Sequence, residues 1–247
     1  MKIAVISDIH GNIDALEAVI KDIKNEGCEK VFVLGDYAMV GAEPAQVIDW
    51  FMEKQSNENY KMIQGNTDLM ITNYSPELYN TVKEKAPIMA EALKNNVLEI
   101  NSKQKEFLQN LPAQLEIEEN GVKFLLVHGS PRRNNEDISP NLELEKVEEM
   151  LENVDADVVL CGHTHLPCGY QTSKKQTVVN VGSIGRPFTE NAKPCYLKIT
   201  IDNGKALFEH RYVDYDNQKA SKRMLEKEFN GAEKLAEMLI NPRVRHF

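Results

Sequence analysis

The sequence predicts an α/β fold in which two mixed β-sheets stack on each other and helices cover their outer faces. Three observations predict it. Apolar runs alternate with amphipathic segments in the first half, short strands follow one another in the second, and the Asn-Gly pair at 120–121 separates two β segments. With 247 residues, 42% of them hydrophobic, the chain can bury one large core, so we expect a single domain over residues 1–247.

The strands are predicted from short apolar or alternating runs. Residues 2–7 (KIAVIS) and 31–34 (VFVL) have the continuous apolar character of buried strands. The Asn-Gly pair is a strong hairpin signal, and VKFLLV at 122–127 forms the second arm of that hairpin. Further strands are expected at residues 60–64, 157–161, 168–173, 177–181, 195–201 and 205–213.

Helices are predicted where apolar residues recur at helical spacing, as Ile13, Leu16, Ile20 and Ile23 do in residues 13–26. Other helical stretches are expected at residues 44–54, 76–110, 141–152 and in a C-terminal tail at 216–247. The charged helical insert at 67–112 is either a lid over a site or a surface segment without substrate contact. The tail packs on the body or on another subunit, which leaves a homo-oligomer open, or it binds a partner.

Charge and cysteine content argue against several classes of function. A formal net charge of −9 disfavours binding to nucleic-acid polymers and acidic membranes, because both need a cationic surface. The four cysteines form no CxxC pair, which disfavours a disulfide framework or a zinc knuckle. Residues 1–6 do not resemble a signal peptide, and no stretch approaches the roughly 20 apolar residues of a membrane helix. We expect a cytoplasmic protein.

Polar residues cluster where the predicted strands end, the edge at which open α/β sheets bind ligands. Each motif is weak alone, since Gly-Asp or Gly-Asn after a strand is usually a turn. However, two side chains that lie two residues apart in an extended backbone point the same way and can hold one ion. Four of the six histidines lie at these strand ends, and the residues concerned are Asp8, His10, Asp36, Asn66, His128, His163 and His165.

This combination of side chains predicts a site for transition-metal ions. Aspartate, asparagine and histidine supply oxygen and nitrogen ligands that suit manganese, iron, zinc, nickel or cobalt better than calcium. Because no cysteine belongs to the set, a closed structural zinc site is disfavoured.

The order D-x-H, G-D, G-N, H and G-H-x-H, from Asp8 to His165, resembles the calcineurin-like metallophosphoesterase superfamily. The segment VNVGS at 179–183 is similar to the later strand and turn of its small prokaryotic phosphodiesterase branch. The resemblance covers about two thirds of the chain. It implies a four-layer α/β/β/α sandwich that hydrolyses a small or nucleotide-like phosphate ester with a hydroxide bridging two divalent metal ions.

The resemblance also implies a role for each matching residue. Asp8, His10 and His165 would hold one metal, Asn66, His128 and His163 would hold the other, and Asp36 would bridge them. Asp36, Asn66 and His128 are the expected catalytic residues. Thr164, between the paired histidines, is expected to be structural.

One position departs from the family pattern. Many members carry a histidine after the G-N asparagine, thought to protonate the leaving group or hold the phosphate, whereas this chain has Thr67, a poor proton source near neutral pH. The small phosphodiesterase branch also lacks that histidine, so the change favours a phosphodiesterase over a phosphomonoesterase or protein phosphatase. Asp68 or a bound water remains as a proton donor. A non-catalytic scaffold, like the retromer subunit of this fold, is the alternative outside enzymes.

Four residues are weaker candidates for substrate contacts. Arg132 and Arg133 follow His128 closely and either could bind a phosphate with its planar donors, although a solvated loop pair is the simpler interpretation. Asn12 binds phosphate or caps the helix that starts near Ile13. Arg186, which follows SIG at 183–185, could face the same cleft.

Overall fold

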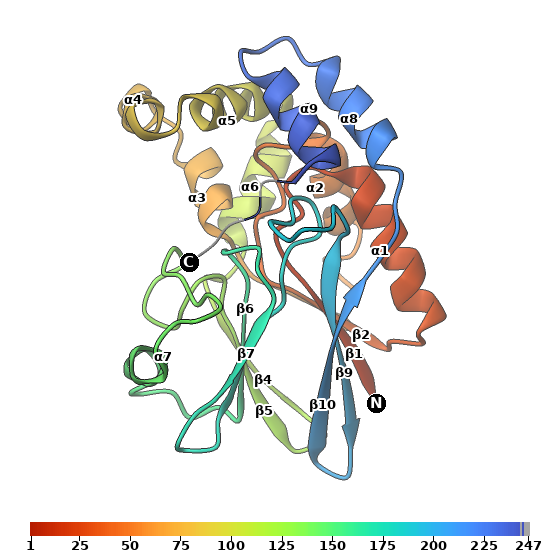
Figure 1. The fold of residues 1–247 in the computed structure, drawn as a ribbon, viewed down its shortest axis with the longest axis vertical. Helices are drawn as coiled ribbons and strands as arrows, with labels where there is room; N and C mark the ends of the chain where they lie inside the picture. The colour runs from red at the N-terminus through yellow and green to blue at the C-terminus, as the bar shows by residue number, and fades with distance from the viewer. Residues whose placement is uncertain (243, 245–247) are drawn as a thin grey trace.

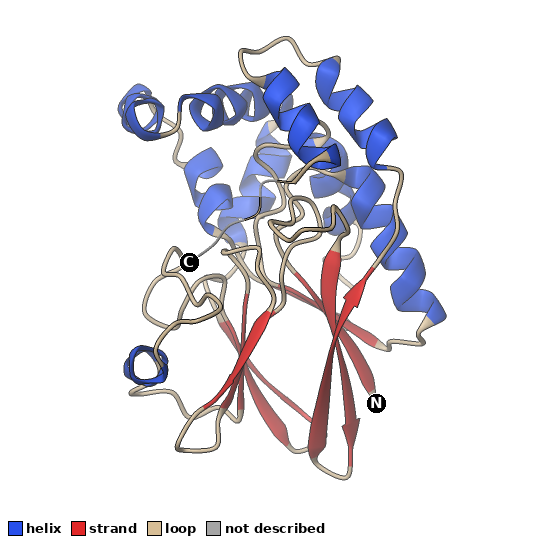
Figure 2. Ribbon diagram, viewed as in Figure 1, coloured by secondary structure: helices blue, strands red, loops and turns tan. Residues whose placement is uncertain are grey.

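The structure is a computed structural model that describes residues 1–242 and 244. Two five-stranded sheets face each other, in the strand orders β10-β9-β1-β2-β3 and β4-β5-β6-β8-β7 (Figures 1 and 2). The strands are β1 (Lys2–Ile6), β2 (Lys30–Val33), β3 (Tyr60–Met62), β4 (Leu115–Glu119), β5 (Val122–Leu126), β6 (Val158–Cys161), β7 (Cys168–Gln171), β8 (Thr177–Asn180), β9 (Cys195–Asp202) and β10 (Lys205–Tyr212).

In each sheet, three neighbouring strands run parallel, and the other two strands pair antiparallel with their neighbours. β1, β2 and β3 run parallel in the first sheet, and β5, β6 and β8 run parallel in the second. The predicted hairpin joins β4 to β5, with Asn120 and Gly121 at φ 49° and 76°, the left-handed turn that Asn-Gly favours. The carboxyl ends of the parallel strands therefore carry the loops that hold the predicted ligands.

Alternation along β1 explains its continuous apolar sequence. Ile3 and Val5 belong to the core between the two sheets, whereas Ala4 and Ile6 belong to the core under the helices. Successive side chains of a strand point to opposite faces, so a strand covered on both faces is apolar throughout. The same arrangement holds for the other central strands, and the sandwich core extends across both sheets.

The helices form the outer layers. They are α1 (Ile13–Asn25), α2 (Pro44–Met52), α3 (Asn66–Thr72), α4 (Pro76–Lys85), α5 (Pro87–Glu99), α6 (Ser102–Asn110), α7 (Leu144–Met150), α8 (Asn217–Leu225) and α9 (Ala232–Ile240). In the described part of the chain, α7 is the helix that covers the outer face of the second sheet, while the others gather above and beside the first (Figure 1). The predicted four-layer sandwich is confirmed, and the layer formed by α7 is thin.

The insert and the tail both pack on the body. From the insert, Leu93 and Phe107 are buried in the core under the helices, and from the tail so are Met224 and Leu235. The helices predicted at 76–110 and 216–240 are present, and the part of the predicted tail at 243 and 245–247 lies outside the described residues. None of the described helices has the length and apolar character needed to cross a bilayer.

Candidate metal centre

The predicted ligands lie on loops with unusual backbone geometry. Side chains other than glycine rarely adopt positive φ, which costs roughly 1–2 kcal/mol per residue. Such strain persists where the surrounding structure fixes it and is typical of functional sites. Five of the seven predicted ligands adopt it: Asp8 (55°), His10 (50°), Asp36 (57°), His163 (67°) and His165 (63°).

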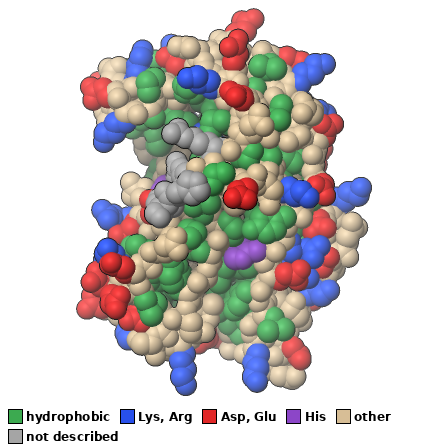
Figure 3. Space-filling model, in the orientation of Figure 1, with side chains coloured by type: hydrophobic (Ala, Val, Ile, Leu, Met, Phe, Trp, Pro, Cys, Tyr) green, Lys and Arg blue, Asp and Glu red, His purple; other side chains and the backbone are tan. Residues whose placement is uncertain are grey.

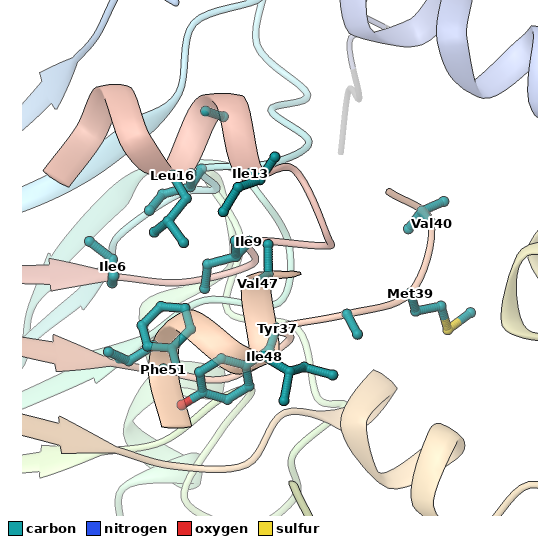
Figure 4. Packing of buried hydrophobic residues seen from close by; sticks show 14 of the residues in the cluster. Ile6, Ile9, Ile13, Leu16, Tyr37, Met39, Val40, Val47, Ile48 and Phe51 are labelled. Carbon is teal, nitrogen blue, oxygen red and sulfur yellow. The ribbon is translucent and has the colours of Figure 1, made fainter. Parts of the chain in front are cut away.

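Buried apolar neighbours hold these loops in place. Ile9, between Asp8 and His10, points into the core together with Tyr37, which follows Asp36 (Figure 4). The loops after β1 and β2 also bind each other, since the backbone N–H of His10 donates to the carbonyl of Asp36 at 2.9 Å. The predicted ligands on these two loops are thus fixed by packing beside them, which lets their side chains meet above the sheets.

Asp8, His10 and His165 form the first group of candidate ligands. Nε2 of His10 lies 3.0 Å from Nε2 of His165, and Oδ1 of Asp8 lies 3.2 Å from the latter and 3.7 Å from the former. Nδ1 of His10 binds the Met39 carbonyl at 3.0 Å, and Nδ1 of His165 binds the Arg186 carbonyl at 2.6 Å. A carbonyl only accepts, so both rings carry a proton on Nδ1.

This arrangement suits a cation. The Nε2 lone pairs of His10 and His165 face each other, and Oδ1 of Asp8 is buried with no hydrogen-bond partner in the part of the chain that the structure describes. Ligands about 2.1 Å from a tetrahedral or octahedral metal lie about 3.0–3.4 Å from one another. Two of the observed separations, 3.0 and 3.2 Å, fall within this range, and the third, 3.7 Å between Nε2 of His10 and Oδ1 of Asp8, is slightly longer.

A second group lies beside the first and contains Asp8, Asp36 and His128. Nε2 of His128 is 2.9 Å from Oδ1 of Asn66 and 3.4 Å from Oδ2 of Asp36, while its Nδ1 binds the Leu34 carbonyl at 2.7 Å. Oδ2 of Asp36 is also 3.7 Å from Nε2 of His10. The Asp36 carboxylate therefore lies between the two groups.

His163 is oriented differently from the other three histidines. Its Nε2 lies 3.3 Å from Oδ1 of Asp137, which favours a proton on Nε2, and its buried Nδ1 has no hydrogen-bond partner among residues 1–242 and 244. Its ring centroid is 5.3 Å from that of His128. His163 thus offers Nδ1, and not Nε2, to a cation. The sequence analysis missed Asp137, because no local spacing connects this loop acid to a histidine in a later strand-end motif.

Residues of this cluster shift the pKa values of one another. Burial, with the nearby His165, lowers the pKa of His10 to about 4. Burial also lowers the pKa of His128, but the carboxylates of Asp36 and Asp8 outweigh it and raise that pKa to about 10. The buried carboxylates therefore demand a positive charge, which either a proton on His128 or a metal ion can supply. Metal binding and protonation compete at such sites.

Neighbouring residues position the ligands. The Thr67 N–H donates to Oδ1 of Asp36 at 2.9 Å, and its hydroxyl donates to the Ala38 carbonyl at 3.2 Å. Asp68 is fully buried, and its carboxylate accepts the backbone N–H groups of Asp36 and Tyr37 at 2.9 and 3.1 Å. Asp68 therefore lies behind Asp36 as a support, and burial beside the Asp36 carboxylate raises the pKa of Asp68 to about 7. Its role as a proton donor stays a prediction.

The VNVGS segment has a similar positioning function. Nδ2 of Asn180 donates to the Gly162 carbonyl at 2.6 Å and to the Thr164 hydroxyl at 2.9 Å, so it fixes the loop that carries the paired histidines. The hydroxyl of Ser183 donates to the Asp8 carbonyl at 2.9 Å. Thr164 is fully buried, as expected of a structural residue. A Cβ at Gly162 would collide with the side chain of Asp8, so this loop needs glycine there.

Three of the four predicted substrate contacts are occupied with other partners. Arg132 and Arg133 both bind Glu136, at 2.7 and 2.9 Å. Oδ1 of Asn12 accepts the N–H of Ala15 and caps α1, which selects the capping interpretation. A phosphate contact by any of these three stays a prediction that must compete with the observed bonds.

Arg186 lies beside the metal centre. The ring of Phe188 stacks on His165 with centroids 4.7 Å apart, and the Arg186 guanidinium lies 5.2 Å from the Phe188 centroid. Two sulfur atoms approach the guanidinium, that of Met89 in α5 at 3.5 Å and that of Met238 in α9 at 3.7 Å. The insert and the tail therefore meet next to the first ligand group.

The chain is similar to known proteins in sequence and in structure. An uncharacterized protein of Methanocaldococcus jannaschii is 28% identical over 238 residues, which cover 90% of this chain and 91% of that protein. The crystal structure of a hypothetical protein from Pyrococcus horikoshii has a TM-score of 0.87 at 23% identity, covering 99% of each chain. A metallophosphoesterase from Sphaerobacter thermophilus has a TM-score of 0.76 at 22% identity, covering 97% of this chain and 98% of that one.

These two solved structures confirm the architecture, and a family model decides the family. The calcineurin-like phosphoesterase superfamily domain matches residues 1–204, which contain all seven predicted ligands and the VNVGS segment. The chain belongs to the calcineurin-like phosphoesterase superfamily.

Proposed function

We propose that the chain is a phosphodiesterase that acts on a small or nucleotide-like ester with two divalent transition-metal ions. The observation that carries the proposal is the 3.0 Å approach of Nε2 in His10 to Nε2 in His165. Both rings have their Nδ1 protons committed to backbone carbonyls, so two lone pairs meet in a buried place beside Asp8. A cation removes that repulsion.

The proposed division of ligands assigns all seven residues, including Asn66 and His163, which belong to neither of the two groups. Asp8, His10 and His165 hold one ion, Asn66, His128 and His163 hold the other, and Asp36 is shared. In support, Oδ2 of Asp36 lies within 3.7 Å of Nε2 in both His10 and His128. The buried Nδ1 of His163, without a partner among the described residues, supports its inclusion in the second set.

Bound ions would supply Lewis acidity for the activation of water and of the phosphoryl group. The chain itself supplies a fixed, buried frame of ligands, and with two divalent ions bound this frame would attract an anionic ester locally, although the net charge of the chain is −9. It supplies no proton at the position of Thr67, whose hydroxyl already donates to the Ala38 carbonyl. The leaving group must therefore depart largely as an anion, which favours esters of acidic alcohols.

The test compares two esters with the same leaving group. Protein loaded with Mn²⁺ is expected to hydrolyse bis(p-nitrophenyl) phosphate with a higher kcat/KM than p-nitrophenyl phosphate. In a series of diesters, the rate should fall steeply as the pKa of the leaving alcohol rises. Asp36→Asn should lose most of the activity, whereas Asp155→Asn, a change at an aspartate whose side chain is 98% exposed, should keep it.

Other outcomes separate the alternatives. A preference for the monoester would favour a phosphomonoesterase or a protein phosphatase. A protein that binds no divalent metal and hydrolyses neither ester would favour the non-catalytic scaffold. A flat dependence on the leaving alcohol would reveal a proton donor elsewhere in the site.

A further inference from the structure

The loop after β2 has a strained backbone beside His10. Met39 and Val40 adopt φ angles of 70° and 78°, in the left-handed region that favours glycine, and Figure 4 shows both residues on the loop that leaves Tyr37. Such angles are uncommon for other residues and exceptional for a β-branched one such as valine. A strained backbone persists only where the surrounding structure fixes it. The contacts of residues 38–41 therefore decide whether this part of the loop keeps its shape.

The shape of this loop sets the orientation of the His10 ring. Nδ1 of His10 lies 3.0 Å from the Met39 carbonyl and 3.3 Å from the Ala38 carbonyl. Because a carbonyl only accepts, the ring proton stays on Nδ1 and the lone pair stays on Nε2, the atom that faces His165. The loop also lies directly against the backbone, since a Cβ at Gly41 would collide with the His10 carbonyl. If the Met39 carbonyl moved, the ring could turn or exchange its tautomer.

Asn96 of α5 binds this part of the loop from the insert. Its side chain is fully buried, Oδ1 accepts the N–H of Met39 at 2.7 Å, and Nδ2 lies 3.5 Å from the Gly41 carbonyl. The amide thus contacts the chain on both sides of Val40, with an acceptor and a donor on one planar group. Leu93 of the same helix is buried in the core under the helices, which fixes the helix that carries Asn96.

We infer that Asn96 is a positioning residue for the first of the two proposed metal ions, acting through the Met39 carbonyl on the ring of His10. The inference rests on the proposed function, because it takes His10 as a ligand. Asn96 lies 57 residues from Met39 along the chain, outside every ligand motif. On the side shown in Figure 3, the molecule is hollowed between the helices of the insert and the loops above the sheets. The insert therefore both borders this hollow and fixes a ligand.

The first test is calorimetric titration of Mn²⁺ into full-length protein stripped with a chelator. Asn96→Ala removes the acceptor of the Met39 N–H and should weaken one binding step about 10-fold, the lower end of the range for groups that orient a metal-binding histidine. The other step should stay unchanged, because the Leu34 carbonyl orients His128. The weakened step should be the one that Asp137→Ala leaves unchanged, and the double variant should weaken both.

The second test follows the His10 tautomer in metal-free protein. Long-range ¹H–¹⁵N NMR spectra distinguish a ring proton on Nδ1 from one on Nε2. The wild type should carry the proton on Nδ1, and Asn96→Ala should show a larger share of the Nε2–H form. A general loss of stability would not change this ratio in the folded protein. The wild-type spectrum decides even if the variant does not fold, because a proton on Nε2 of wild-type His10 would overturn the inference.

Asn95→Ala is the matched control. It makes the same change at the preceding residue of α5, whose side chain donates to Glu99 at 2.6 Å, and it should keep both binding steps and the His10 tautomer. Two unchanged steps in Asn96→Ala, or equal weakening of both steps with an unchanged tautomer, would overturn the inference alone. A wild-type protein that binds no Mn²⁺ would overturn the proposed function and, with it, the link from Asn96 to a metal ion.

Discussion

Replacing Asp137 tests the metal centre without removing a ligand. Its carboxylate lies 3.3 Å from Nε2 of His163, and half of its side chain is exposed, so a substitution leaves the core intact. With Asp137 present, the His163 proton stays on Nε2 and the lone pair stays on the buried Nδ1. Without it, the ring can turn or exchange tautomer, and the second of the two proposed ions would lose a fixed ligand.

The size of the effect follows from this contact between Asp137 and His163. Removing the partner that orients a metal-binding histidine typically weakens metal affinity about 10- to 100-fold. We expect Asp137→Ala to weaken the affinity for the second metal ion about 100-fold. Asp137→Asn should weaken it about 10-fold, because an amide oxygen still accepts the proton but carries no charge. The ion that we propose for Asp8, His10 and His165 should keep its affinity, since the two histidine rings are oriented by backbone carbonyls.

The assay is calorimetric titration of Mn²⁺ into protein stripped with a chelator. The wild type should show two binding steps, and the Asp137 variants should show one unchanged step and one weakened step. Asp155→Asn, at an aspartate 98% exposed, is the matched control. Two unchanged steps in Asp137→Ala, or equal weakening of both, would refute the orientation argument. The melting temperature of the metal-free variant should match that of the metal-free wild type.

Three further predictions concern stability and substrate binding. Asn12→Ala removes the α1 cap and should cost about 1 kcal/mol in urea unfolding with KM unchanged, whereas a raised KM at unchanged stability would reveal a phosphate contact. Arg132, aided by Ser130, holds the pKa of Glu136 at about 2, below its usual 4.5, so Glu136 stabilises the fold above pH 4.5 and this contribution is lost as pH falls towards 2. The melting temperatures of wild type and Glu136→Gln should accordingly converge over that range, and a constant difference would contradict the assignment. Leu16→Ala, at a fully buried position, should cost about 2–5 kcal/mol in denaturant unfolding, whereas Leu207→Ala, 69% exposed in the wild type, should change it by less than about 0.5 kcal/mol.

The sequence predicted the elements well because their signals are local. Alternation in β1, helical spacing in α1 and the Asn-Gly turn at 120–121 each depend on residues close together along the chain. The boundaries were less accurate: the strand expected at 60–64 ends at Met62, and the one expected at 168–173 ends at Gln171. In both cases the chain leaves the sheet to form a loop or turn, although an apolar residue, Ile63, still follows the first of these strands.

The insert shows what the sequence left open. The structure gives one part of it a clear function, since Oδ1 of Asn96 in α5 accepts the N–H of Met39 at 2.7 Å while the Met39 carbonyl binds His10. The insert therefore supports the loop that orients a ligand. No helical pattern in residues 67–112 could reveal the contact between Asn96 and Met39. That the insert also opens and closes over a substrate stays a prediction.

By itself, the sequence determined the two-sheet architecture, the family and the positions from Asp8 to His165 that carry ligand-type side chains, because strand ends and short motifs are encoded by adjacent residues. Only the tertiary structure decided how those side chains meet. The two Nε2 atoms that approach to 3.0 Å belong to His10 and His165, 155 residues apart, and their separation depends on strand order and register. The tautomer of His163 depends likewise on Asp137, and the strained loop beside His10 is bound by Asn96 of α5. Contacts between distant segments arise from packing, which no local pattern specifies.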